Sequence, residues 1–542
     1  MLIVPLYLLS CQTVSSVVAT ATNYKNSVYS WRAMIYNDRQ VIRALMSWRK
    51  MATKKPILRK GIKERASFSL INFVHSLRTP ERFFLIFSIL FGFLFVFLTP
   101  PLQVPDEQAH FIRAYQVSDL DFVSPSFKLK GQTRYGSQLP TSLTTADGVF
   151  LGNVAGHAEN DFPKSIFKQY IKQPLNPDKT QRTIVEAAAV YSPVVYVPQA
   201  AGISIGKIFE ASPLIMIWLG RLMNLALWVS VMYFALKLWP VAKWAIVILA
   251  LNPVAVFLSA SLSPDVTNIS FAFLFVSLVV NTFTSSSQGL LSKKYLGVIL
   301  GALVVLALSK PVDLVFGLLL FAIPWRRFGT KLRYWSYCAT ALLLSGGLFA
   351  LWNYQIKDIL VTAVKYQYAG NISDSAQLSY ILHAPLSYLH ILIDNFVLVI
   401  PGSAGDAVLG TFFGVFGWLD TSIPLWTVLT YILLLFLALL YQFGRGAVVT
   451  VKQKLLFLTV FALGFIGNIT AMYFNSTTVG NNLISGVQGR YFIAFSVLLL
   501  VLFTARKKIL ELSNDTMSLL LSSGMVVVLG MTALKLFLRY YH

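Results

Sequence analysis

Long apolar stretches recur along this chain and restrict what it can fold into. The first clear one covers residues 83–99 and reads FFLIFSILFGFLFVFLT. A helix needs about 20 apolar residues to cross a bilayer. Only 12% of the residues are charged and the mean hydropathy is +0.65, whereas about a quarter of the residues in a soluble domain are charged. The sequence therefore excludes a soluble globular enzyme and a disordered protein, and it predicts an all-α integral membrane protein with about eleven transmembrane helices. The predicted spans are residues 83–99, 213–236, 241–260, 266–284, 295–309, 312–324, 335–352, 424–443, 454–474, 491–504 and 516–536.

The basic residues indicate which side of the membrane each loop occupies. The net charge is +23, and residues 1–82 hold 14 Lys and Arg against 3 Asp and Glu. With the N-terminus on the cytoplasmic side, five later loops that also carry 14 Lys and Arg fall inside, as the positive-inside rule requires. This assignment treats residues 191–209, which Pro193 and Pro198 interrupt, as a surface or re-entrant helix; a full span there would reverse every later loop. Because topology explains the positive charge, no nucleic acid partner is expected.

The positions of the apolar spans and of the basic residues divide the chain into four parts. Residues 1–82 are predicted to be a basic cytoplasmic segment, in which 1–50 read as an upstream extension because Met51 begins a natural basic start. Residues 83–352 form a transmembrane module with a large extracytoplasmic loop at 100–190. Residues 353–423 form an outer loop with a possible re-entrant segment, and 424–542 hold the C-terminal transmembrane helices.

The most informative motif follows the first span directly and reads PPLQVPDEQAHFIR, residues 100–113. If a helix begins near Pro105, then Asp106, His110 and Arg113 share one of its faces, and Glu107 lies in the first turn. Acidic residues also favour a helix N-terminus for purely structural reasons. Ionisable groups at a membrane boundary are costly, however, and this favours a functional site.

Further polar residues are predicted on the same outer face. Each has an ordinary structural explanation: helix-start chemistry for Asp265, extension of the side chain to the interface for Lys310 and an interfacial anchor for Trp418. An anionic ligand, or pairing with an outer carboxylate, would explain Arg490. The outer-face candidates are Asp265, Lys310, Trp418, Asp420, Arg490 and Tyr491.

Five motifs in order resemble one family of bacterial multi-pass membrane proteins of unknown function. They read PDEQAHFIRAYQVS, YSPVVYVPQAAG, LSPDVTNISFAF, GWLDTSIP and GVQGRYF, and the resemblance runs from about residue 80 to the C-terminus. The usual proline after the Asp-Glu pair is Gln108 here. That family is similar in architecture to the GT-C membrane glycosyltransferases, which carry an acidic residue at the start of the first large extracytoplasmic loop and often a second one in the next short outer loop. Asp106 with Glu107, and Asp265, match those two positions.

The resemblance implies a GT-C-like fold and an inverting glycosyltransferase of the bacterial cytoplasmic membrane. Such an enzyme moves a sugar from a polyprenyl-phosphate donor to an envelope glycan, glycolipid or protein on the extracytoplasmic face. Asp106 would be the general base, with Glu107 as the second choice. No cofactor is implied with certainty, although Asp265 could orient the acceptor or help to hold a divalent metal. The substrate-binding candidates are His110, Arg113, Asp265, Lys310, Trp418, Asp420, Arg490 and Tyr491.

Other functions remain open at this point. A transporter or flippase of lipid-linked sugars needs ionisable residues in mid-span and internal repeats; Arg221 is the main charge of that kind, and no clear repeat is visible. A polysaccharide polymerase or ligase would also use arginines of the outer face. A structural membrane scaffold is the fourth reading.

Overall fold

The computed structural model describes residues 79–145, 147–240, 242–285, 289–367, 372–396, 404–442, 449–504, 509–510 and 512–542. The predicted basic segment 1–82 lies outside these residues except for its last four. Met51, the predicted natural start, lies outside them as well.

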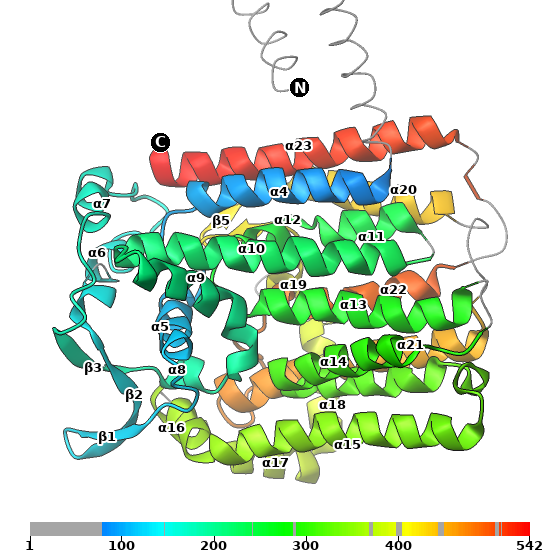
Figure 1. Cartoon of the computed structure of the whole chain (residues 1–542), viewed down its shortest axis with the longest axis horizontal. Helices are drawn as coiled ribbons and strands as arrows, with labels where there is room; N and C mark the ends of the chain where they lie inside the picture. Colours follow the sequence, from blue (N-terminus) through cyan, green and yellow to red (C-terminus); the bar gives the residue numbers. More distant parts are fainter. Residues whose placement is uncertain are drawn as a thin grey trace, which may run out of the picture. The chain divides into compact units, whose positions relative to one another are not determined.

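Long helices lying side by side form the main part of the described structure (Figure 1). Six of the described helices are long and apolar enough to cross a membrane, so the chain is a multi-pass membrane protein. Hydroxyl side chains begin several of them: Ser212 and Ser513 each accept a hydrogen bond from a main-chain N–H of the first turn, and Thr450 forms a capping box with Gln453. The six are α4 (Pro80–Leu98), α10 (Pro213–Leu238), α13 (Asp265–Thr284), α15 (Lys331–Gln355), α21 (Val451–Ser476) and α23 (Asn514–Tyr541).

The prediction of about eleven spans is therefore too high. The other five apolar segments are helical but are shorter or interrupted. Asn252 breaks one of them, because its side chain accepts hydrogen bonds from the first N–H groups of a new helix that begins at Pro253. Irregular backbone at membrane depth persists only inside protein, and the two helices beside Asn252 are almost wholly buried. These segments are α11 (Lys243–Ala250) with α12 (Pro253–Ser259), α14 (Lys293–Ser309), a 3-10 helix at Pro311–Ala322, α20 (Leu425–Gln442), and a 3-10 turn at Gly489–Phe492 with α22 (Ile493–Leu502).

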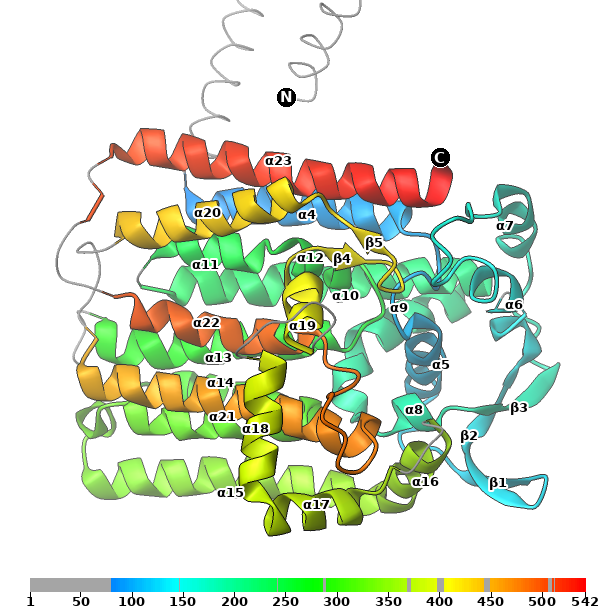
Figure 2. The same cartoon turned by 180° about the vertical axis from the view of Figure 1, so that it is seen from behind.

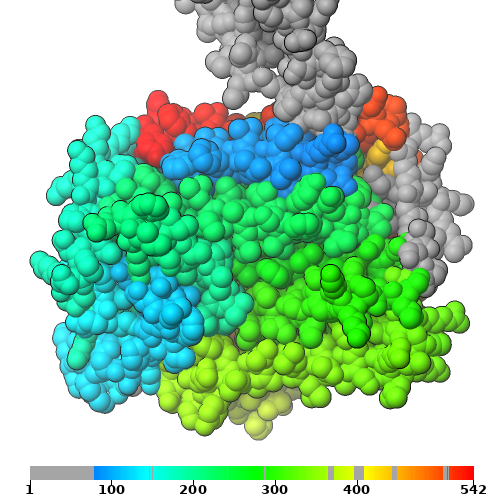
Figure 3. Space-filling model, viewed as in Figure 1, coloured from blue at the N-terminus to red at the C-terminus, as the bar shows by residue number. Residues whose placement is uncertain are grey.

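The predicted outer loop 100–190 is folded and lies at one end of the long helices (Figures 1 and 3). Its three strands, β1 (Ser126–Leu129), β2 (Gln132–Pro140) and β3 (Thr180–Ile184), form an antiparallel sheet in that order, with Gly136 opposite Ile184. Residues 191–209 end in a helix of 12 residues, which is too short to cross a bilayer. That helix packs tightly on α10, where a Cβ on Gly202 would lie 2.3 Å from the Leu219 oxygen. The elements are α5 (Glu107–Ser118), β1 (Ser126–Leu129), β2 (Gln132–Pro140), α6 (Asp147–Phe150), α7 (Lys164–Tyr170), β3 (Thr180–Ile184), α8 (Glu186–Ala189) and α9 (Val197–Ile208), with 3-10 turns at Thr141–Leu143 and Pro193–Tyr196.

Short helices fill the predicted outer segment 353–423, and two of them, α18 (Pro385–Phe396) and α19 (Ala404–Phe413), run across the long helices (Figure 2). A two-stranded hairpin closes the segment and pairs Val415 with Ser422. The elements are α16 (Lys357–Gln367), α17 (Asp374–His383), α18 (Pro385–Phe396), α19 (Ala404–Phe413), β4 (Val415–Phe416) and β5 (Thr421–Ser422). A further 3-10 turn, Trp325–Phe328, precedes α15.

Candidate functional site

The turn that follows α4 directs the side chains of Asp106 and Glu107 into different surroundings. Asp106 has a left-handed backbone, with φ of 63°, and α5 begins at Glu107, so the helix start predicted near Pro105 is confirmed. Asp and Asn tolerate this conformation better than most residues. The Asp106 side chain is 54% exposed, whereas Glu107 is fully buried. The two carboxylates therefore have different environments despite being adjacent in sequence.

Four charged side chains from distant parts of the chain meet at this turn, and we call them the charged cluster: Asp106, Asp265, Lys310 and Arg490. Arg490 Nη2 lies 3.0 Å from Asp106 Oδ2, and Arg490 Nε lies 3.7 Å from Asp265 Oδ2. Lys310 Nζ lies 2.7 Å from Asp265 Oδ1. Asp265 begins α13, Lys310 follows α14, and Arg490 precedes α22. The fold thus brings together four of the residues that the sequence singled out.

The charged cluster is balanced in charge but incompletely hydrogen-bonded. Arg490 Nε is buried and makes no hydrogen bond to any described residue. The ring of Tyr491 lies under both cations, 4.9 Å from Lys310 Nζ and 5.4 Å from the Arg490 guanidinium carbon, at distances typical of cation–π contacts. Arg490 can therefore donate a hydrogen bond from Nε to a further anion.

The arrangement does not fit a divalent metal at Asp265, an option that the sequence left open. Both of its carboxylate oxygens face cations, Lys310 and Arg490. Among the described residues, no group of three or more His, Cys, Asp and Glu side chains is placed to bind a metal ion.

A cavity of about 240 Å³ adjoins the charged cluster on the Lys310 side. It lies between the C-terminal parts of α14, α15 and α21, and Lys310 and Tyr491 belong to its wall. Most of the remaining wall is apolar, including Leu308, Val312, Phe349, Trp352 and Met472. A mostly apolar cavity thus adjoins Lys310 of the charged cluster.

His110 lies next to the charged cluster as a buried, neutral group. Its Nδ1 is 2.8 Å from the Tyr196 hydroxyl, and the Tyr191 ring lies edge-on to it at 6.0 Å. Burial lowers the pKa of His110 to about 4; the carboxylates of the charged cluster oppose this shift and the cations add to it. Burial also raises the pKa of Tyr196 and of Tyr191. His110 therefore offers a hydrogen bond, and not a charge, at neutral pH.

This burial predicts how acid affects stability. The unfolded chain binds a proton at His110 below about pH 6.5 and the folded chain only below about pH 4, so stability falls as the pH drops through this window. Between pH 6.5 and pH 5 the loss amounts to about 2 kcal/mol. The measurement is the melting temperature in detergent at both pH values. His110→Gln should show a smaller acid shift than the unmodified protein, and an equal shift in both would contradict the prediction.

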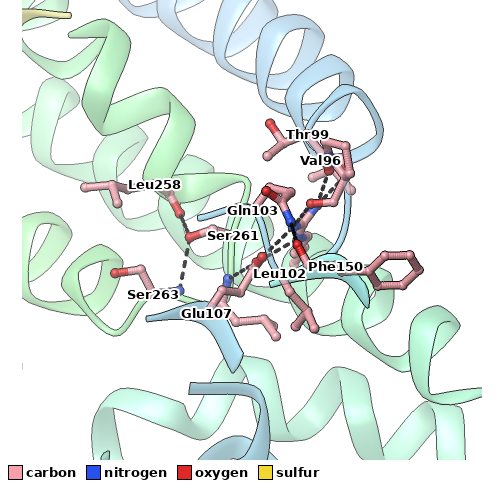
Figure 4. A network of polar contacts seen from close by, with 12 residues as sticks. Val96, Thr99, Leu102, Gln103, Glu107, Phe150, Leu258, Ser261 and Ser263 are labelled. Carbon is pink, nitrogen blue, oxygen red and sulfur yellow. Dashed lines mark hydrogen bonds and ion pairs between the residues drawn. The ribbon is translucent and has the colours of Figure 1, made fainter. Parts of the chain in front are cut away.

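Glu107 forms a buried ion pair with Arg221 of α10. Arg221 Nε and Nη2 donate to the two carboxylate oxygens at 2.8 and 2.5 Å, and both side chains are fully buried. The N–H of Leu262 also donates to Glu107, at 3.2 Å. Figure 4 shows Glu107 between the end of α4 and the loop that holds Ser261 and Ser263. Three main-chain carbonyls accept the remaining bonds from Arg221: those of Val96, Thr99 and Pro100, at 2.9, 2.6 and 3.0 Å.

Arg221 is the residue whose importance the sequence reasoning underestimated. The sequence did contain a signal for this pairing, a single arginine inside an otherwise apolar span. A charge in a span is costly and almost always has a partner. The pairing also distinguishes the two adjacent carboxylates: Asp106 belongs to the charged cluster, whereas Glu107 is buried against Arg221.

Three other predicted binding residues contact the folded loop 100–190 or the C-terminal helix α23 instead. Arg113 donates to the carbonyls of Asp121 and Phe122 at 3.3 and 2.6 Å. Trp418 Nε1 donates to the Leu102 carbonyl at 3.0 Å. Asp420 pairs with Arg539 of α23 at 2.9 Å. Roles for Arg113, Trp418 and Asp420 in substrate binding stay predictions, and these contacts connect them to the turns around the site.

Gly489 lets the segment that carries Arg490 approach α19 closely. A Cβ there would lie 2.2 Å from both the Phe412 nitrogen and the Val408 oxygen, and main-chain atoms cannot easily move away. We expect Gly489→Ala to destabilise the protein by about 1–3 kcal/mol, seen as a lower melting temperature. Gly297→Ala is the matched control, since a Cβ at Gly297 meets nothing within 4 Å. Equal melting temperatures for the two variants would contradict the prediction.

The comparisons with known proteins identify a family but no function. No curated protein and no solved structure matches the chain. One family model, described as a predicted membrane protein (DUF2142), matches residues 89–499. This match includes the whole charged cluster and covers well over half of the sequence. The chain therefore belongs to the DUF2142 family of predicted membrane proteins.

Proposed function

We propose that this protein is a membrane glycosyltransferase that moves a sugar from a polyprenyl-phosphate donor to a cell-envelope glycan, glycolipid or protein on the extracytoplasmic face. One observation carries the proposal: Lys310 lines a mostly apolar cavity, and ion pairs link it through Asp265 and Arg490 to the exposed carboxylate of Asp106. A lipid-linked sugar phosphate supplies an anion for the cations and a hydrocarbon chain for the cavity, and the carboxylate can take the proton of an acceptor hydroxyl.

The two cations suit the phosphate. Lys310 belongs both to the charged cluster and to the cavity wall, so a phosphate against its ammonium would lie where a lipid chain leaves the cavity. Arg490 Nε makes no hydrogen bond to the described residues, its ion-pair partner Asp265 Oδ2 lying 3.7 Å away, and a guanidinium can hold two phosphate oxygens at once. Asp265 pairs with both cations and keeps them together.

Asp106 suits the general base. In the structure its carboxylate is paired with Arg490 at 3.0 Å. A phosphate bound to Arg490 competes for that guanidinium and leaves the Asp106 carboxylate available to an acceptor hydroxyl. The hydroxyl oxygen then forms a bond to the anomeric carbon while the bond from that carbon to the phosphate oxygen breaks. The proton passes to Asp106, the bonding electrons leave with the polyprenyl phosphate, and this single displacement inverts the anomeric centre.

The surroundings of Arg221 favour a transferase over a transporter. A transport pathway needs an ionisable group that can change partners in mid-span. Arg221 is the candidate charge, but it is fully buried and hydrogen-bonded to Glu107 and to three carbonyls at the end of α4.

The decisive experiment is a transfer assay. The purified protein in lipid vesicles is given a polyprenyl-phosphate hexose with a radiolabelled sugar, together with an envelope extract as acceptor, and mass spectrometry of the product counts the sugars added. The proposal expects label in the acceptor with one sugar per event. Repeated units would indicate a polymerase, and movement of intact donor across the bilayer without transfer would indicate a flippase; either outcome contradicts the proposal.

A further inference from the structure

Arg221 uses its full hydrogen-bonding capacity at one junction. A guanidinium carries five N–H donors. Nε donates to Glu107, the two Nη1 donors reach Val96 and Thr99, and the two Nη2 donors reach Pro100 and Glu107. The acceptors belong to the end of α4 and the start of α5, that is, to both sides of the turn that ends at Asp106. This turn therefore has its position set by α10.

A second residue on the same face of α10 holds the loop that leads to Asp265, another member of the charged cluster. Asn224 lies one turn beyond Arg221, and its Nδ2 donates to the carbonyls of Ser261 and Ser263 at 2.8 and 3.1 Å. In this loop the Ser263 hydroxyl accepts a hydrogen bond from the N–H of Asp265, at 3.2 Å. The N–H of Leu262, in the same loop, donates to Glu107. The loop before Asp265 is thus attached to α10 and to Glu107.

We propose that Arg221 and Asn224 are positioning residues, and that one face of α10 sets the separation between Asp106 and Asp265. The effect of this positioning on catalysis rests on the proposed function. Arg490 contacts Asp106 at 3.0 Å and Asp265 at 3.7 Å, so a shift of either loop changes the place where a phosphate is held relative to the base. A displacement of about 1 Å is enough to reduce a reaction rate on the order of 100-fold.

Arg221→Lys tests the role of Arg221 directly. Lysine keeps the positive charge opposite Glu107 but has three donors in place of five. The expected result is a kcat lowered about 100-fold, with a donor KM within about threefold of the unmodified value, because Lys310 and Arg490 remain in place. Rates are expressed per folded molecule, from the monodisperse fraction in size-exclusion chromatography.

Arg134→Lys is a matched control. Arg134 makes the same two-pronged pair with Glu186, at 2.8 Å to each oxygen, and the Tyr135 N–H donates to that carboxylate as Leu262 does to Glu107. We expect this variant to keep the kcat per folded molecule. If both lysine variants lower kcat equally, or if Arg221→Lys retains the unmodified kcat, the positioning role is overturned.

A thiol measurement keeps the inference testable apart from catalysis. Asp106→Cys is labelled with a charged maleimide in three backgrounds: otherwise unmodified, with Arg221→Lys and with Asn224→Ala. The inference expects the labelling rate to change severalfold with Arg221→Lys and to change less with Asn224→Ala, which acts on the other loop. Unchanged labelling with Arg221→Lys overturns the inference. Changed labelling in a protein that transfers no sugar supports the positioning and refutes only the proposed function.

Discussion

Replacing Asp106 with asparagine is expected to lower the rate of sugar transfer by about 10²- to 10⁴-fold, the usual contribution of a general base. Asparagine has nearly the same size, tolerates the left-handed backbone at this position and can still accept a hydrogen bond from Arg490. It cannot take a proton from the acceptor hydroxyl. The fold and donor binding should therefore persist while the chemical step slows, and single-turnover transfer at saturating donor measures that step.

Asp178→Asn is the control for this prediction, because Asp178 is an exposed acidic residue of the same loop, residues 100–190. It should transfer sugar at the unmodified rate. Glu107→Gln provides a contrast: it weakens a buried ion pair, so its main effect should be a lower melting temperature. Transfer by Asp106→Asn at a rate within a few-fold of the unmodified protein would remove Asp106 as the base.

Replacing Arg490 with glutamine is expected to reduce kcat/KM for the donor by about 10- to 100-fold, which corresponds to a charged hydrogen bond of about 1.5–3 kcal/mol. The loss should appear mainly in KM, because the phosphate is bound before and during the reaction. Arg490→Lys should recover only part of the affinity, since an ammonium keeps the charge but cannot bind two oxygens in one plane.

The control here is Arg333→Gln, which removes an exposed arginine at the start of α15 and should leave the donor KM unchanged. Initial rates at a series of donor concentrations give both constants. An Arg490→Gln variant with the unmodified KM would show that the phosphate is held elsewhere.

The class of fold could be predicted from the sequence, but the number of spans could not. Hydropathy identifies each apolar segment, and all of these segments are helical in the structure. It does not register that Asn252 caps a new helix inside an apolar stretch, nor that residues after Lys310 wind into a 3-10 helix. Both features depend on local hydrogen bonds and on burial by neighbouring helices, and a count of apolar residues gives no information on either.

The members of the charged cluster were predictable, whereas their contacts were not. Asp106, Asp265, Lys310 and Arg490 each stand out as ionisable residues next to an apolar segment. Asp106 and Arg490 are 384 positions apart, however, and only the packing of helices brings them together. The distinction between Asp106 and Glu107 was equally invisible, since it arises from one left-handed backbone residue and from a partner 114 positions further along the chain.

The pair between Glu107 and Arg221 also bears on how the chain enters the membrane. During synthesis, α4 and Glu107 precede α10, so the residues that pair with Arg221 have already been made when it emerges. An unpaired arginine at the centre of a span costs about 2.5–3.5 kcal/mol on insertion; Arg221, the ninth residue of α10, should cost less than this, and pairing with Glu107 should lower its cost further. Insertion of α10 should therefore be efficient behind α4 and its turn and poor when α10 is presented to the translocon alone, a difference that a glycosylation-based insertion assay measures. The position of α4 and Glu107 before α10 in the sequence would thus help α10, with its buried arginine, to insert into the membrane.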